Sequence, residues 1–230
     1  MTIKIGVLWC CYFNRSIFGF RRQLQHAYRP PSLFASKMRD ASHEVQFLVC
    51  DDMLQTSDLD GTTRKLQDDV QLLYIMTHGE FHSTGYEACL HAANWKPAAA
   101  GIGQKNLAVA VFDTCELIDS GSATSWQTVW QGATLGSNIR LLLGFDGAVA
   151  IDRASALRGK AFAENLINGN TFADAWISAV KSTVKSVHSK AVAIGIGDTV
   201  PDAQSVLNTA SLSSMPSARG TGTPSFKERY

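Results

Sequence analysis

The strongest constraint on the fold is a set of short apolar runs that recur along the chain. These runs lack strict apolar–polar alternation and are rich in β-branched residues, which is typical of strands buried on both faces of a parallel sheet. Segments with helical spacing lie between several of them, the clearest from Thr171 to about His188. Strands that alternate with helices predict a mainly parallel sheet covered on both faces. The predicted strands are residues 3–9, 44–50, 70–77, 107–113, 139–145 and 190–196.

The domain organisation follows from length and composition. With 230 residues, of which 45% are hydrophobic and 18% charged, the chain is long enough to bury a sizeable core. We assign residues 1–210 to one domain. Residues 211–230 are rich in Ser, Gly and Pro and offer little to bury, so they are expected to form a flexible C-terminal tail.

Charge and cysteine content narrow the classes of function. A net charge of +1 provides no electrostatic basis for binding nucleic acid or an anionic membrane. There is no apolar run of membrane-spanning length, and the N-terminal segment is read as a first strand rather than a signal peptide. Five cysteines without a framework spacing indicate reduced thiols. We therefore expect a cytoplasmic protein.

Reactive side chains follow two of the predicted strands. Residues 70–77 lead into His78 and Gly79, and residues 107–113 lead into Cys115. Ligands bind beyond the carboxyl ends of strands in an open parallel sheet, and the ends of adjacent strands lie roughly 5–10 Å apart. A thiol, with an ordinary pKa near ~8.5, needs an imidazole to accept its proton. The sequence thus predicts a nucleophile, Cys115, and an acid–base group, His78.

Backbone groups complete this predicted site. Because Gly79 has no side chain, its N–H could approach a substrate carbonyl and form an oxyanion hole with the N–H of Cys115. The alternative is structural: Cys115 would be a small core residue, and His78 would be a histidine hydrogen-bonded at a strand end.

These motifs resemble the caspase-like cysteine peptidases, a group that includes caspases, metacaspases, gingipains, clostripain and legumain. The matching blocks are "YIMTHG" and "AVFDTC", and Asp-Thr-Cys is most similar to the Asp-x-Cys of metacaspases. Residues 141–162 add a weaker match to a region that helps build the specificity pocket of metacaspase-like relatives. The chain departs from metacaspases by having Glu-Leu-Ile after the cysteine in place of His-Ser-Gly, and it lacks the Gln-Ala-Cys-x-Gly of caspases.

The resemblance implies a three-layer caspase-like sandwich with a six-stranded, mostly parallel sheet, and a cysteine endopeptidase that uses a Cys–His dyad without a cofactor. In metacaspase-like relatives, the carboxylate two residues before the nucleophile lines the pocket for the residue preceding the scissile bond. Here that residue is Asp113, and Asp146 could close the same pocket. Two carboxylates would favour Arg or Lys. The alternatives are that Asp113 accepts backbone N–H groups and that Asp146 is a turn residue.

Two other classes of function compete with the peptidase. A zinc-dependent hydrolase could use His78, His82, Cys89 and His91, but Gly and Phe in this stretch argue against the helix that would align His78 with His82. His-x-Glu at residues 78–80 resembles part of the zinc deaminase signature, but the Pro-Cys-x-x-Cys that completes it is missing. We therefore expect no metal ion.

The other alternative is a binding module. No glycine-rich phosphate loop follows the first strand, which counts against a nucleotide-binding version. A catalytically silent caspase-like scaffold that acts through protein partners stays open. The expected partners are a protein or peptide substrate and, as a further candidate, a regulatory protein.

Overall fold

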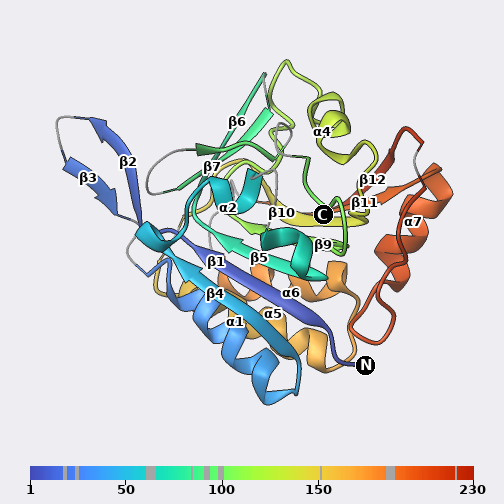
Figure 1. The fold of residues 1–230 in the computed structure, drawn as a ribbon, viewed down its shortest axis with the longest axis horizontal. Coiled ribbons are helices and arrows are strands. Elements are labelled where there is room, and N and C mark those ends of the chain that lie inside the picture. The colour runs from blue at the N-terminus through green and yellow to red at the C-terminus, as the bar shows by residue number, and fades with distance from the viewer. Residues whose placement is uncertain are drawn as a thin grey trace.

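A mixed sheet forms the centre of the protein (Figure 1). The computed structural model describes residues 1–17, 20–23, 26–60, 66–83, 85–90, 94–97, 101–150, 152–184, 190–220 and 222–230. Within these ranges the sheet has seven strands in the order β12-β11-β10-β9-β5-β1-β4. The strands are β1 (Lys4–Trp9), β4 (Glu44–Cys50), β5 (Leu72–Met76), β9 (Val109–Asp113), β10 (Leu141–Asp146), β11 (Lys190–Gly197) and β12 (Ser225–Arg229).

The sheet is mostly parallel. The pairs β4–β1, β1–β5, β5–β9 and β9–β10 are parallel, whereas β11 and β12 add antiparallel pairs at one side. All six predicted strands are present. The prediction of a mainly parallel sheet covered on both faces is confirmed.

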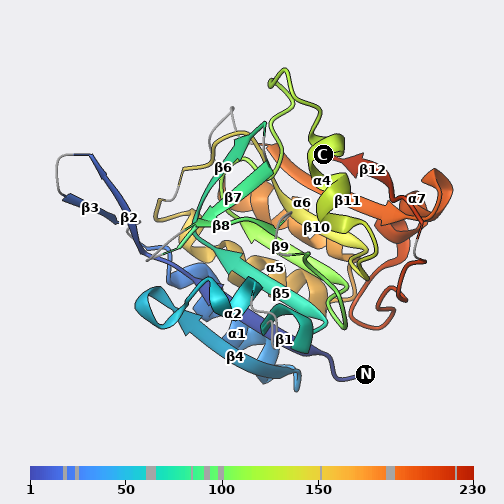
Figure 2. The same ribbon diagram turned by 45° about the horizontal axis from the view of Figure 1, so that its top comes forward.

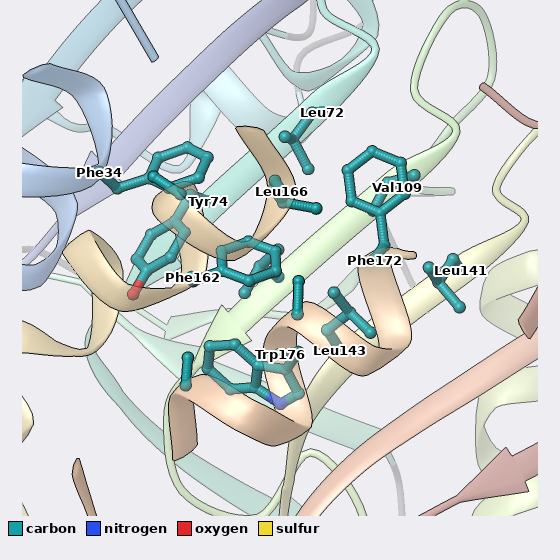
Figure 3. Close-up of a cluster of buried hydrophobic side chains, with 14 of the residues drawn as sticks. Phe34, Leu72, Tyr74, Val109, Leu141, Leu143, Phe162, Leu166, Phe172 and Trp176 are labelled. Atoms are coloured by element: carbon teal, nitrogen blue, oxygen red, sulfur yellow. The ribbon is translucent and has the colours of Figure 1, made fainter. Parts of the chain in front are cut away.

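One face of the sheet is covered by helices. They are α1 (Arg29–Asp40), α5 (Arg158–Ile167), α6 (Phe172–Thr183) and α7 (Val200–Thr209). Alternate strand residues such as Tyr74 and Leu143 point toward them and form an aromatic-rich core (Figure 3). Within this core the ring of Tyr74 stacks on Phe34 with centroids 4.8 Å apart, and Trp176 donates a hydrogen bond to the carbonyl of Gly144.

The other face is covered by a small sheet and by α4 (Trp126–Thr134) (Figure 2). The small sheet has the order β6-β7-β8, with β6 (His78–His82), β7 (Gly85–Cys89) and β8 (Asn94–Trp95). The short helix α2 (Ser57–Asp60) also contributes to this second core.

A separate hairpin of β2 (Tyr12–Ile17) and β3 (Phe20–Gln23) projects to the left in Figure 1. Short 3₁₀ segments span Asp51–Met53, Leu66–Asp69 and Ser155–Leu157.

The C-terminal residues differ from the sequence prediction. The composition of residues 211–230 predicts a flexible tail, and the resemblance to caspase-like peptidases implies six strands, but β12 pairs with β11 as a seventh strand. Arg219 is buried and donates hydrogen bonds to the carbonyls of Gly222 and Thr134, both at 2.8 Å. Backbone pairing and a buried arginine therefore hold a segment that has few apolar side chains.

Local features define the starts of α1 and α6. Helix α1 begins at Arg29, because prolines are well tolerated in the first helical turn, where their missing N–H has no partner to lose. Thr171 caps α6 by accepting a hydrogen bond from the Asp174 N–H, and the predicted extension over 185–189 lies outside the described residues. None of the helices in the described ranges is both long and apolar enough to cross a membrane.

Candidate active site

The structure brings the ends of the two reactive strands together. β5 and β9 are parallel neighbours, and Met76 pairs with Asp113. His78 and Cys115 each follow two residues later, so both lie at the same edge of the central sheet. The His78 side chain is 26% exposed, and Cys115 is partly buried. The adjacency that the sequence could only assume is thus a feature of the fold.

Gly79 packs closely against the backbone next to Cys115. A Cβ atom at Gly79 would come within 3.0 Å of the Cys115 carbonyl oxygen and of the hydroxyls of Tyr86 and Thr114. The hydroxyls of Tyr86 and Thr114 are hydrogen-bonded to each other, so neither can move away from an added methyl group without breaking that bond. Close packing is therefore a reason for glycine here, independent of any contact with substrate.

We expect Gly79→Ala to destabilise the protein by about 1–3 kcal/mol, because the added methyl group overpacks rigid backbone and buried hydroxyls. Denaturant unfolding measures the change. The matched control is Gly132→Ala in α4, where an added Cβ meets nothing within 4 Å. This control should be neutral or stabilising by up to about 1 kcal/mol. Equal stability of the two variants would contradict the packing argument.

The Cys115 thiol is held by the loop that follows β10. Its Sγ lies 3.4 Å from both the backbone nitrogen and the carbonyl oxygen of Val149. Burial raises the pKa of the thiol; the Val149 hydrogen bond opposes this, and the carboxylates of Glu116 and Asp113 raise the pKa further. At neutral pH the resting group is the thiol, so a base must take its proton during any reaction.

A strained turn follows Cys115. Glu116 has a φ of 57°, in the left-handed region that non-glycine residues rarely adopt. Its N–H donates to the Gly147 carbonyl at 2.9 Å, and its carboxylate accepts a hydrogen bond from the Phe81 N–H at 3.2 Å. Glu116 therefore ties the Cys115 loop to β6 and to the end of β10. The sequence pattern contains no signal for this role, because nothing local predicts a left-handed glutamate.

On β6, the carboxylate of Glu80 lies between the imidazoles of His78 and His82. His78 Nε2 lies 3.2 Å from Glu80 Oε1, and His82 Nε2 lies 3.2 Å from Glu80 Oε2. These three residues alternate along one strand, so they project from the same side of it. The sequence indicates Glu80 only as the glutamate of a zinc-deaminase-like His-x-Glu. Its contact with His78 follows once β6 is known to be a strand.

The structure does not support Asp113 as a substrate-binding residue. Its side chain is fully buried, and its carboxylate accepts hydrogen bonds from Arg158 Nε at 2.9 Å, from Arg158 Nη2, and from the Tyr74 hydroxyl at 2.5 Å. Arg158 is also fully buried and lies over the ring of Phe145. The predicted specificity residue is therefore part of an internal ion pair.

The Asp113 carboxylate and burial together shift the pKa values of Arg158 and Tyr74. Burial disfavours the charge of Arg158, but the neighbouring Asp113 carboxylate more than offsets this and raises the pKa of the guanidinium. Burial, together with the same carboxylate, raises the pKa of Tyr74 well above its ordinary value. Asp113 is thus paired with Arg158 and fully buried.

Asp146 also has internal partners. It is the last residue of β10, is 8% exposed, and accepts hydrogen bonds from the Ser120 N–H at 3.0 Å and the Ser120 hydroxyl at 2.7 Å. Its carboxylate fastens the loop after Cys115 to the sheet. The two carboxylates predicted to form one substrate pocket therefore hold two different parts of the scaffold.

The fold and the site define an α/β protein with a histidine and a cysteine after neighbouring strands of one sheet edge. By sequence, the chain belongs to the DUF6345 family, described as a domain of unknown function, whose model matches residues 10–212. No curated protein matches the sequence. One similar solved structure is the crystal structure of caspase-1 from Spodoptera frugiperda, which is 12% identical. The match covers 98% of this chain and 88% of that chain, with a TM-score of 0.45.

Proposed function

We propose that this protein is a cysteine hydrolase that cleaves peptide bonds, with Cys115 as the nucleophile and His78 as the acid–base group. The pairing of Met76 with Asp113 carries the proposal, because it sets both reactive residues at one sheet edge. The tight packing of Gly79 against the Cys115 carbonyl keeps the segments after β5 and β9 close together, although it does not by itself favour catalysis. A thiol and an imidazole after adjacent strands are the two groups that nucleophilic thiol chemistry requires.

The proposed reaction begins from the protonated thiol. As Sγ attacks the substrate carbonyl carbon, His78 accepts the thiol proton, and the N–H groups of Gly79 and Cys115 donate hydrogen bonds to the oxyanion. His78 then gives the proton to the leaving amine as the C–N bond breaks, which leaves a thioester on Cys115. Water attacks the thioester carbonyl carbon while His78 accepts its proton. The C–S bond then breaks, His78 returns the proton to Sγ, and the carboxylic acid product leaves the free thiol.

Glu80 has the geometry of a positioning residue for this step. Its Oε1 lies 3.2 Å from His78 Nε2. If Nε2 donates to this carboxylate, Nδ1 is the nitrogen that accepts the thiol proton, and the carboxylate stabilises the imidazolium that forms. The arrangement supplies an orienting group for the base, as nucleophile–base pairs usually need.

The proposal does not include a preference for Arg or Lys. That preference required Asp113 and Asp146 to face a substrate side chain, and both carboxylates are occupied by internal donors. Hydrolysis of reporter peptides with Arg, Lys, Asp or Asn before the scissile bond measures the selectivity directly.

A silent scaffold is the second candidate, and one observation favours it. Burial and two nearby carboxylates raise the pKa of Cys115, which opposes formation of the reactive thiolate. A scaffold would keep such a cysteine for packing alone. Only a reaction that needs both substrate recognition and an activated thiol distinguishes the two candidates.

A peptidyl chloromethylketone panel provides this reaction. We expect covalent labelling of Cys115 in the wild type, because bound peptide places the electrophile beside the thiol and the His78 base. Mass spectrometry of the digested protein locates the label. The internal control is Cys50, a partly buried thiol on β4 that a simple alkylating reagent without a peptide should reach. Labelling of Cys50 but not of Cys115 by the peptidyl reagents would favour the scaffold.

A further inference from the structure

A second chemical group lies beside the proposed dyad, on the hairpin formed by β6 and β7. His78 and Cys89 are directly opposite each other in the antiparallel register. Directly opposite residues of an antiparallel pair project from the same face, and Glu80 shares that face because it is two residues from His78. One imidazole nitrogen, one carboxylate oxygen and the Cys89 sulfur all lie within 4.8 Å of one another.

These donor atoms match a particular class of cation. Thiolate, imidazole and carboxylate are the ligands of zinc, with bond lengths of about 2.0–2.3 Å, whereas calcium and magnesium take oxygen ligands. Tetrahedral bonds of that length put ligand atoms roughly 3.3–3.8 Å apart. His78 Nε2 and Glu80 Oε1 are already 3.2 Å apart. A thiolate and a carboxylate together also neutralise the charge of a divalent ion.

The surroundings of these three residues have the features of a built site. Cys89 is 1% exposed, and its carbonyl accepts a hydrogen bond from the Thr77 hydroxyl. The His78 and Glu80 side chains are 26% and 18% exposed, so an ion can enter from solvent. The second oxygen of Glu80 contacts His82 Nε2 at 3.2 Å, and a partner of this kind orients a ligating carboxylate.

We propose that His78, Glu80 and Cys89 bind a zinc ion, with Cys89 rather than Cys115 as the sulfur ligand. Binding releases the Cys89 thiol proton to solvent and leaves a fourth coordination position for water. Because the ion takes the nitrogen lone pair of His78, it also blocks the hydrolase. This inhibitory role rests on the proposed function, whereas the binding itself does not.

The strand β6 removes one of the two reasons for which the sequence argued against zinc. The absence of a helix after His78 is correct, but strand alternation aligns His78, Glu80 and His82 equally well. Of the residues first considered as ligands, His91 lies outside the described residues.

Cobalt binding tests the site without relying on activity. Chelator-treated, gel-filtered protein is titrated with Co²⁺, and we expect visible d–d bands, a thiolate-to-cobalt charge-transfer band, and displacement of one equivalent by Zn²⁺. Cys89→Ala should lose the charge-transfer band, and Glu80→Gln should weaken binding. His82→Ala should lower affinity by about 10–100-fold, as for other residues that orient a metal ligand. Far-ultraviolet circular dichroism establishes that each variant is folded.

Cys115→Ala is the decisive control, because it should retain the full cobalt spectrum. A charge-transfer band that persists in Cys89→Ala and disappears in Cys115→Ala would overturn the site, as would the absence of any metal uptake by the wild type. Activity is measured separately in wild-type protein, where Zn²⁺ should inhibit and a chelator should restore hydrolysis. Cobalt binding without hydrolysis under any condition would refute the proposed function and leave the metal site intact. Zinc binding with unchanged hydrolysis would refute only the inhibition.

Discussion

Replacing Cys115 by alanine is expected to remove nearly all hydrolysis of a reporter peptide, and His78→Ala is expected to have the same effect. A nucleophile and its base act as a unit, so the loss of either should lower turnover by roughly 10⁴-fold or more. The His78 side chain is partly exposed and Cys115 lies in a loop, so neither change should unfold the protein. The measurement is the rate on the peptide panel, with the unfolding midpoint of each variant recorded beside it.

The double variant sharpens this prediction. Because the two residues act in one proton transfer, Cys115→Ala combined with His78→Ala should be no slower than either single variant. Cys50→Ala removes another partly buried thiol, on β4, and should leave the rate unchanged. Full activity of Cys115→Ala, or a rate in the double variant that falls by the product of two independent effects, would show that these residues do not form a dyad.

The central sheet could be predicted from the sequence because its strands are buried on both faces. Such strands appear as continuous apolar runs, and each of the six runs corresponds to a strand. β12 could not be recognised in this way. Its sequence, Ser225–Arg229, contains one large apolar residue, and it is held by backbone pairing to β11 and by an ion pair between Arg229 and Asp174.

The part of the candidate site that lies at the ends of β5 and β9 could be predicted from the sequence. His78 and Cys115 follow β5 and β9 directly, so topology alone places them together. The β6–β7 hairpin was missed because "HGEFHSTGYEAC" mixes polar and apolar residues, and the grouping of His78, Glu80 and Cys89 depends on its register. Spacing along the chain contains no information about such cross-strand partners.

The role of Asp113 was misread for a different physical reason. A carboxylate two residues before a candidate nucleophile has the same sequence signature whether it faces substrate or core. The residue that determines the role of Asp113 is Arg158, which is 45 positions away along the chain. Its buried guanidinium needs a carboxylate partner. Long-range pairing of this kind is determined by the packing of α5 against the sheet, and no local pattern predicts it.

Asp113→Ala is expected to destabilise the protein by about 3–5 kcal/mol, because it leaves the Arg158 charge buried without its partner. Denaturant unfolding of the variant against wild type measures the loss. The matched control is Glu164→Ala, which removes ion pairs with Lys37 and Lys160 whose side chains are all 36% or more exposed. An exposed pair of this kind is worth about 0–1 kcal/mol, so the control should be nearly neutral.

A second substitution separates an internal ion pair from a substrate pocket. Asp113→Ala combined with Arg158→Met removes both charges, and an apolar side chain in place of the guanidinium should recover part of the lost stability. If Asp113 selected a basic substrate instead, Asp113→Ala would keep its stability and lose its preference for Arg or Lys over Asp. The buried carboxylate, with Arg158 and Tyr74 already bound to its oxygens, predicts the opposite pattern. The free energy of unfolding should therefore fall in Asp113→Ala. Any change in its peptide selectivity should result from this loss of stability rather than from a lost contact with substrate.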